Sequence, residues 1–453
     1  MVLSVVCTMA ISRLIRPLGL IAATLVTARM AAAGAGGLAE DHPTNSLDGP
    51  ISLTQAKRLA FLRNWDLLAA KSDVDIATAQ RIVAREFPNP IASLGLTKIR
   101  VDDHPNSTSM GNGFGERGYD TVAAVNQLIE IGGKRRARKE SATAALKSVE
   151  ARLADARRLL DQGVSQAYVA ALLGERNRQV LTDSAASLRQ EAKIAEVREH
   201  AGDISSSDRS QIAIAAQRLE LDAEAAAAAA RNARIQLEVL LGVKQPDGNV
   251  QLSDALERLV ESPDAPTNTV EAAVMTRPDV AAAEHARAKA EADLRLQKAL
   301  RVPDPTFFAQ YEHEPPDQPN SVGFGVSFPL PLWNRNRGGI FAAQATLEQA
   351  RVQAEKVRAQ AAADVAVAQN SNASALARWQ RYRDELQPMS AKIRETVAYA
   401  YQKGGASLLD LLSAQRNDNE VRLATAQAAA DTATAAAALK AALNLTASVK
   451  PMP

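Results

Sequence analysis

The sequence predicts a mainly α-helical protein with a membrane β-barrel part, in which one structural plan is used twice. Residues 321–332 alternate apolar with small or polar side chains, which is typical of a strand with one apolar face. They lead into more than sixty residues rich in Ala, Gln, Glu, Lys and Arg, the composition of a long helix. A strand-like stretch, two glycines and a long helical stretch also occur in that order at residues 119–200. This repetition predicts the duplication.

The two repeats are expected at residues 51–243 and 279–445, each with the plan helix, Pro-x-Pro motif, two strands, long helix, glycine-containing turn, helix. The Pro-x-Pro motifs lie at residues 88–90 and 303–305. The predicted strands cover about 91–101, 119–131, 306–314 and 321–332. An inter-repeat linker, residues 244–278, and a tail, residues 446–453, complete this part of the chain.

Residues 1–35 have the layout of a cleaved secretory signal peptide. Arg13 and Arg16 precede a short apolar run, and small residues of the Ala-x-Ala type follow it. The run is shorter than the roughly 20 residues that a membrane-spanning helix needs. A linker, residues 36–50, leads to the first repeat. The one cysteine, Cys7, lies in the signal peptide, so we expect no disulfide, thiolate metal site or cysteine nucleophile in the mature chain.

Four alternating strands in a secreted chain favour the outer membrane of a Gram-negative cell, where barrels span the bilayer. On the last strand the predicted lipid-facing side chains are Val322, Phe324, Val326 and Phe328. Four strands do not close a barrel, and an open edge in lipid leaves backbone groups without hydrogen bonds. Two copies would give eight strands with a filled interior, and three would give twelve strands with a lumen. The residues themselves leave both numbers open.

Long helices account for most of the remaining chain. Residues 134–200 and 338–404 would each extend on the order of 100 Å, at roughly 1.5 Å per residue. Shorter helices, at about 204–242 and 407–445, would return beside them after the glycine-containing turns. Helices of this length are stable when they pack against neighbours, so we expect coiled coils.

Three motifs resemble one known family: IEIGGKRRAR at 129–138, LPLWNRNRGGI at 330–340 and YQKGGASLLDLLSAQR at 401–416. They are similar to the TolC-like outer-membrane efflux factors, and more closely to the CzcC-type subgroup that serves heavy-metal efflux. The resemblance covers about residues 51–445. It implies a homotrimer in the outer membrane whose twelve-stranded barrel continues into a long periplasmic tunnel of helices.

The resemblance also implies a function and partners. The trimer would be the exit duct of a tripartite system of the resistance-nodulation-division type, and it would export heavy-metal cations from the periplasm or cytoplasm to the exterior. Its partners would be a periplasmic adaptor (membrane fusion protein), an inner-membrane proton-driven pump and outer-membrane lipid. The sequence does not identify the cation.

By the same resemblance, the two helix-to-helix turns form the periplasmic entrance. Asp410 matches an acidic residue that lines the constriction, and Asp208 and Tyr401 match a hydrogen-bonded pair that holds the entrance shut. Ala406 stands where the best-known member has an arginine, so one closing ion pair would be missing, and Ser413 replaces a second acidic residue. The residues expected to dock the adaptor are Gly202, Gly404, Gly405, Ser407 and Leu408. The alternative interpretation is that Asp208 and Asp410 simply cap helices.

The sequence indicates no enzyme, no cofactor and no resident metal site. Its five histidines have no paired spacing, and no glycine-rich phosphate loop follows a strand. The net charge of +2 gives no reason to expect nucleic-acid binding. Two other functions remain open at this point. One is a duct for drugs or type I protein secretion, and the other is a periplasmic coiled-coil adaptor without barrel strands.

Overall fold

The computed structural model describes residues 49–97, 120–260, 270–314 and 318–445. All of them belong to one unit that begins at Ser46. The predicted signal peptide, most of the linker after it and the predicted tail lie outside the described residues. Within the described ranges, the structure contains no helix that combines the length and the apolar character needed to cross a membrane.

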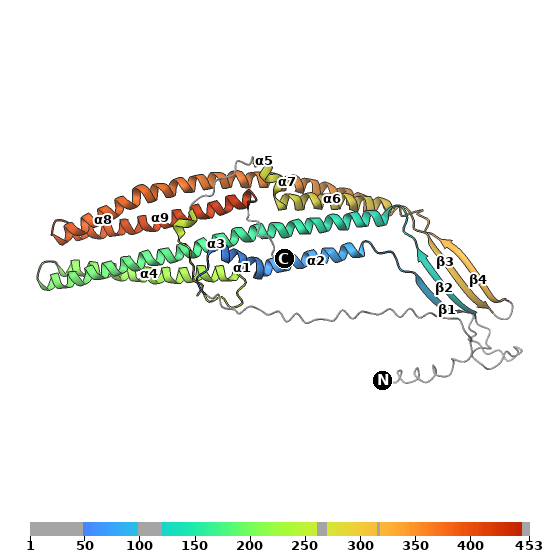
Figure 1. Cartoon of the computed structure of the whole chain (residues 1–453), viewed down its shortest axis with the longest axis horizontal. Coiled ribbons are helices and arrows are strands. Elements are labelled where there is room, and N and C mark those ends of the chain that lie inside the picture. The colour runs from blue at the N-terminus through green and yellow to red at the C-terminus, as the bar shows by residue number, and fades with distance from the viewer. Residues whose placement is uncertain (1–48, 98–119, 261–269, 315–317, 446–453) are drawn as a thin grey trace, which may run out of the picture. The chain divides into compact units, whose positions relative to one another are not determined.

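The two halves follow the same plan, as the sequence predicts (Figure 1). The first half contains α1 (Leu53–Arg63), α2 (Trp65–Val83), β1 (Ile91–Thr97), β2 (Asp120–Leu128), α3 (Lys134–His200) and α4 (Ser206–Leu240). Two short elements connect the halves, η1 (Leu256–Val260) and α5 (Val270–Thr276). The second half contains α6 (Pro278–Ala299), β3 (Thr306–Glu314), β4 (Gln318–Ser327), α7 (Arg337–Arg381), η2 (Tyr382–Leu386), α8 (Gln387–Gln402) and α9 (Leu408–Ala442).

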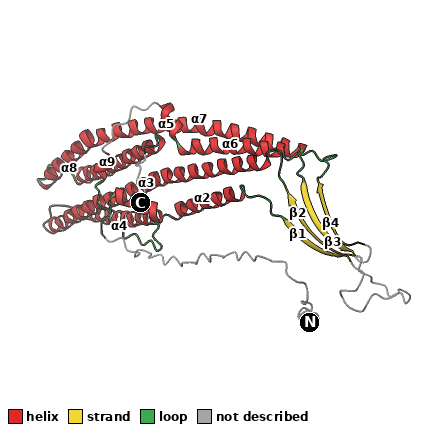
Figure 2. Ribbon diagram, turned by 45° about the vertical axis from the view of Figure 1, so that its right-hand side comes forward, coloured by secondary structure: helices red, strands yellow, loops and turns green. Residues whose placement is uncertain are grey.

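The four strands form one antiparallel sheet in the order β1-β2-β3-β4 (Figure 2). The central pair, β2 with β3, joins the two repeats. In the described part of the chain, β1 and β4 each pair on one side only. The prediction for the last strand is wrong at both ends, because β4 spans 318–327 and not 321–332. Pro329 and Pro331 have no backbone N–H to donate to a ladder, so the strand ends before them.

The first long helix matches its prediction, and the second does not. α3 is one helix of 67 residues. The second is divided into α7 (45 residues), the π-helical turn η2 and α8 (16 residues). The cause is Pro388, whose ring would clash with the carbonyl group four residues earlier and which donates no hydrogen bond. A π-helical turn just before the proline accommodates both effects.

The largest core cluster lies where α1, α3, α4, α9 and η1 meet, and Tyr168 is at its centre with no exposed surface. The Tyr168 hydroxyl oxygen is 2.8 Å from the carbonyl oxygen of Ile51 and 3.0 Å from a carboxylate oxygen of Asp254. Burial, with a contribution from Asp254, raises the pKa of Tyr168 to about 12. Ile51 also forms a parallel bridge with Leu252, so this site fixes the start of the chain's first helix against the segment between the repeats.

We expect Tyr168→Phe to lower the free energy of unfolding by about 1–2 kcal/mol, because it removes the one hydroxyl proton that lies between the Ile51 carbonyl oxygen and the Asp254 carboxylate. Thermal unfolding followed by circular dichroism would measure the change. The control is Tyr399→Phe, since the side chain of Tyr399 is 64% exposed and loses no buried partner. Equal destabilisation by the two substitutions would contradict this account of Tyr168.

Candidate functional site

The predicted entrance residues lie at two helical hairpins, α3–α4 and α8–α9, whose turns are at the end of the helices away from the sheet (Figure 1). Gly202 and Gly404 have φ angles of +81° and +79°. Such left-handed residues end helices, and glycine adopts the conformation without strain. Ser205 and Ser407 then cap the returning helices through their hydroxyl groups. The two turns are therefore built alike.

Tyr401 packs between the two hairpins of one chain. Its side chain is 8% exposed and belongs to a cluster with Leu188 of α3, Ile212 of α4 and Leu411 of α9. The guanidinium carbon of Arg198 lies 5.4 Å from the ring centroid. Burial raises the pKa of Tyr401. Tyr401 thus joins the hairpins by packing.

The charge of Asp208 also acts on Tyr401. It contributes to the raised pKa of Tyr401, whereas Arg198 opposes that rise. In the single chain, the hydrogen bonds among the described residues do not include one between Tyr401 and Asp208. The hydrogen-bonded pairing that the resemblance implies therefore stays a prediction for the assembled protein.

Asp410 forms a reciprocal cap at the start of α9. Its carboxylate accepts hydrogen bonds from the Ser407 hydroxyl (2.7 Å) and the Ser407 backbone N–H (3.0 Å), and its own N–H donates to the Ser407 hydroxyl (3.2 Å). These bonds lower the pKa of Asp410. The backbone N–H of Asp208 donates to Ser205 in a related arrangement. Both acids thus take part in caps, and the carboxylate of Asp410 remains exposed and charged.

The predicted docking residues differ in their exposure. Gly202, Gly404, Gly405 and Ser407 are exposed at the turns. Leu408 instead lies in the cluster between the hairpins, with 9% of its surface exposed. The apolar side chain that α9 presents outward at this tip is Leu409, which is 73% exposed. Leu408 therefore holds the hairpins together, because its first-turn position faces α3 and α4.

The sequence reasoning missed Glu191, a half-buried acid on α3 whose charge also acts on Tyr401. Burial raises the pKa of Glu191. No ion pair with Glu191 occurs among the described residues. Glu191 lies about one helical turn from both Leu188 and Ala195, which are buried. Residues at this spacing share one face of a helix, so the sequence could have indicated that Glu191 lies on the contact side of α3.

The sheet has one exposed apolar face. Val322, Phe324 and Val326 are 70%, 81% and 50% exposed, while the glycines between them lie on the other face. Gly325 faces the ring of Phe308, which leaves no room for a side chain. Directly opposed residues share a face. One row across this face therefore comprises Leu94, Ala123, Tyr311 and Val322, and Phe328 continues the exposed apolar surface just beyond β4.

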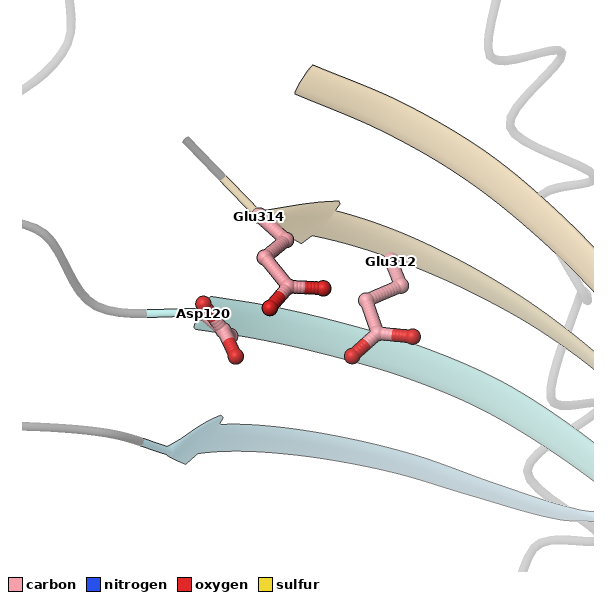
Figure 3. Close-up of side chains that lie close together, drawn as sticks. All are labelled: Asp120, Glu312 and Glu314. Atoms are coloured by element: carbon pink, nitrogen blue, oxygen red, sulfur yellow. The ribbon is translucent and has the colours of Figure 1, made fainter. Parts of the chain in front are cut away.

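The opposite face carries a group of carboxylates that the sequence reasoning did not identify (Figure 3). Asp120, Glu312 and Glu314 each offer an oxygen, and these atoms lie within 4.8 Å of one another. Glu312 is opposite Val122 in the ladder, so all three acids fall on the face away from Phe324. They come from the ends of β2 and β3 farthest from the helices (Figure 1). They concentrate negative charge on that face.

Glu191→Gln should make thermal stability less dependent on pH. The folded pKa of Glu191 is above its unfolded value of about 4.5, so its favourable contribution is complete below pH 4.5 and is lost as the pH rises through the folded pKa. The amide resembles the protonated acid. We therefore expect the variant to melt above the parent at pH 7 and together with it at pH 4. The exposed Glu196, changed to Gln, is the control; if it gave the same result, net charge alone would explain the effect.

Comparison with known proteins places this architecture in a family. The chain matches the model of the outer membrane efflux protein family over residues 58–243 and 269–445. A curated relative, the cobalt-zinc-cadmium resistance protein CzcC of Cupriavidus metallidurans, is 26% identical over 376 residues, or 83% of this chain and 85% of the relative.

Solved structures share the fold. CusC, whose structures concern transmembrane channel formation, has a TM-score of 0.74 and 18% identity, over 88% of this chain and 95% of CusC. The CmeC outer membrane channel of Campylobacter jejuni has a TM-score of 0.74 and 17% identity, over 86% of this chain and 85% of CmeC.

The resemblance to TolC-like efflux factors is thus confirmed. The chain belongs to the outer membrane efflux protein family, whose members are not enzymes but channels of tripartite efflux systems, in the outer membrane with a periplasmic tunnel.

Proposed function

We propose that three copies of this chain form the exit duct of a tripartite system that exports heavy-metal cations. The observation that carries the choice of cargo is the similarity to a cobalt-zinc-cadmium resistance protein over 83% of the chain. A proton-driven pump of the resistance-nodulation-division type would deliver the cation, and a periplasmic adaptor would join pump and duct. The carboxylates of Asp120, Glu312 and Glu314 support this cargo, since negative charge on the inner wall favours cations.

The sheet supports the proposed number of copies. Both edge strands, β1 and β4, need partners in a membrane, and other copies of the chain can supply them. Eight strands would enclose an interior filled by side chains, whereas twelve leave a lumen. The face opposite Phe324 carries Ser93, Gln310 and Glu312, polar side chains that suit a water-filled interior. Three copies therefore fit an efflux duct better than two.

The exposed face with Val322, Phe324, Val326 and Phe328 would then contact lipid. Phe324→Arg would place a charge in hydrocarbon at a cost of about 2–4 kcal/mol near the midplane. We expect the yield of assembled protein in outer membranes to fall, as measured by heat-modifiable mobility in gels. Ser93→Arg, on the opposite face, is the matched control and should assemble normally. If Phe324→Arg assembled as well as Ser93→Arg, the assignment of the two faces would be wrong.

The hairpin turns would form the entrance and the adaptor site. Around a threefold axis, three exposed Asp410 carboxylates would create a negative ring that a trivalent cation can block. Tyr401 and Asp208 would restrain the hairpins, and the absence of an arginine at Ala406 makes this restraint more important. The exposed glycines 202, 404 and 405, with Ser407 and Leu409, would contact the adaptor.

Single-channel recording in planar bilayers would test the entrance. We expect Asp410→Asn to fold normally, because an amide oxygen can still accept the cap bonds, and to lose block by hexamminecobalt at least tenfold, because three charges are removed. Tyr401→Phe should open more often, because in the assembled trimer the Tyr401 hydroxyl would donate a hydrogen bond to Asp208, and a bond to a charged group contributes about 1.5–3 kcal/mol. Asp203→Asn on the other turn is the charge-matched control. Unchanged block and unchanged opening would show that the gate lies elsewhere.

A metal-tolerance panel on a strain lacking this chain would test the cargo. We expect increased sensitivity to at least one divalent transition metal, restored by the parent chain on a plasmid. Sensitivity to dyes and detergents should stay unchanged. The reverse pattern, with full metal tolerance and increased sensitivity to dyes and detergents, would favour a drug duct and reject the metal assignment.

A further inference from the structure

Residues 328–341, which comprise the connection from β4 to α7 and the start of α7, expose an unusual amount of apolar surface. We call this stretch the junction segment. Its exposed apolar side chains are Phe328 (55%), Leu330 (65%), Leu332 (60%), Trp333 (93%) and Phe341 (74%). The segment contains two arginines and no acid. Large apolar side chains that are exposed together in one short segment indicate a contact with a membrane or another molecule.

The junction segment is anchored to α6 near its C-terminal end. Asn336 has a φ of +53°, and its side-chain amide donates to the backbone oxygen (2.8 Å) and side-chain oxygen (2.9 Å) of Gln297 at the end of α6. A side chain at position 339 would press on the side-chain oxygens of Asn336 and Gln297, so Gly339 leaves room for these bonds. The contacts with Gln297 therefore anchor the C-terminal end of the segment to α6.

The two arginines of the segment have unused donors. Arg335 makes one long bond, from Nε to the Pro331 carbonyl oxygen at 3.4 Å. Among the described residues, Arg337 has no side-chain hydrogen bond or ion pair. The corresponding junction of the first repeat is different, because Lys134 pairs with Asp304 at 2.6 Å and Arg138 pairs with Glu130 at 2.5 Å. Arg335 and Arg337 therefore have donors available to an external anion, whereas Lys134 and Arg138 are paired with carboxylates.

We propose that the junction segment binds the periplasmic leaflet of the outer membrane, with Trp333 at the level of the head groups and Arg335 and Arg337 on the phosphates of anionic phospholipids. Tryptophan favours this boundary because its ring is apolar and its N–H is polar. The planar guanidinium group binds a phosphate through two hydrogen bonds. The inference rests on the lipid-facing surface around Phe324 proposed above, which the segment continues, and not on the exported cargo.

Quenching of tryptophan fluorescence by brominated lipids tests the location. The full chain would be placed in nanodiscs whose lipids carry bromine either near the head groups or near the chain ends. We expect bromine near the head groups to quench the parent, and Trp333→Phe to remove most of that quenching. The control is Trp65→Phe, because Trp65 is exposed on α2, and it should leave the lipid-dependent quenching intact. Equal quenching in Trp333→Phe and the parent would overturn the inference.

Lipid retention tests the arginines. In nanodiscs and detergent extracts, the preference for phosphatidylglycerol over phosphatidylcholine should fall about fivefold for each of Arg335→Gln and Arg337→Gln. Arg416→Gln is the control, since this exposed arginine of α9 pairs with Glu420. Inorganic phosphate at millimolar concentration should not displace the lipid. Unchanged lipid preference in the double variant, or displacement by phosphate, would contradict a membrane site.

A second reporter separates the inference about the junction segment from the lipid-facing strand surface on which it rests. Phe324→Trp in the Trp333→Phe background should be quenched by bromine near the chain ends. If position 324 is quenched and position 333 is not, the junction segment contacts a neighbouring copy and this inference fails while the lipid-facing strand stands. If neither position is quenched, the placement of the strand face in lipid fails as well.

Discussion

The assembly depends on one constraint, which is that every backbone hydrogen bond must be satisfied where a chain crosses lipid. Within one chain, β2 and β3 have a hydrogen-bonded strand on each side. Among the described residues, β1 and β4 each have a strand partner on one side only. An edge strand of another copy can supply the missing backbone hydrogen bonds. Oligomerisation is therefore a requirement of the fold, and a lumen results when enough strands join.

The helices continue this arrangement away from the membrane. Small residues, chiefly alanine, make up most of the buried positions of α7 and α9 and let these helices pack closely. Prolines and glycines then set the points where direction changes. Pro329 and Pro331 end the sheet, Pro388 produces the π-helical turn, and Gly202 and Gly404 reverse the chain. Tyr401 and Leu408 connect the reversed ends, so the tips of the two hairpins behave as one packed unit.

Periodicity predicted the fold well because its signals are local. The alternation around Phe324 identified a strand, and the two glycines before Lys134 located the start of α3. The failures depend on distant partners. The proximity of Asp120 to Glu312 follows from the register of β2 on β3, which lie in different repeats. Leu408 was assigned to the surface because the sequence does not reveal which side of a first turn another helix covers.

Pro388 is an instructive intermediate case. The residue is visible in the sequence and its effect on a helix is general, yet the sequence reasoning carried the helix through it. Whether such a proline ends a helix or only distorts it depends on the helices that pack on both sides of it. Here α9 packs against α7, η2 and α8, so the helix continues on the other side of a single π-helical turn.

Closure of the sheet between copies is the central claim, and cysteine cross-linking in outer membranes tests it most directly. The chain's one cysteine, Cys7, lies in the predicted signal peptide and does not interfere. Leu94→Cys on β1 would be combined in turn with cysteine at 322, 324 or 326 on β4. After oxidation, we predict covalent oligomers that end at three copies. The pair Val125→Cys and Ala309→Cys, which face each other on β2 and β3, should give monomers only. A β1–β4 series that ended at two copies, or that produced none, would contradict the account.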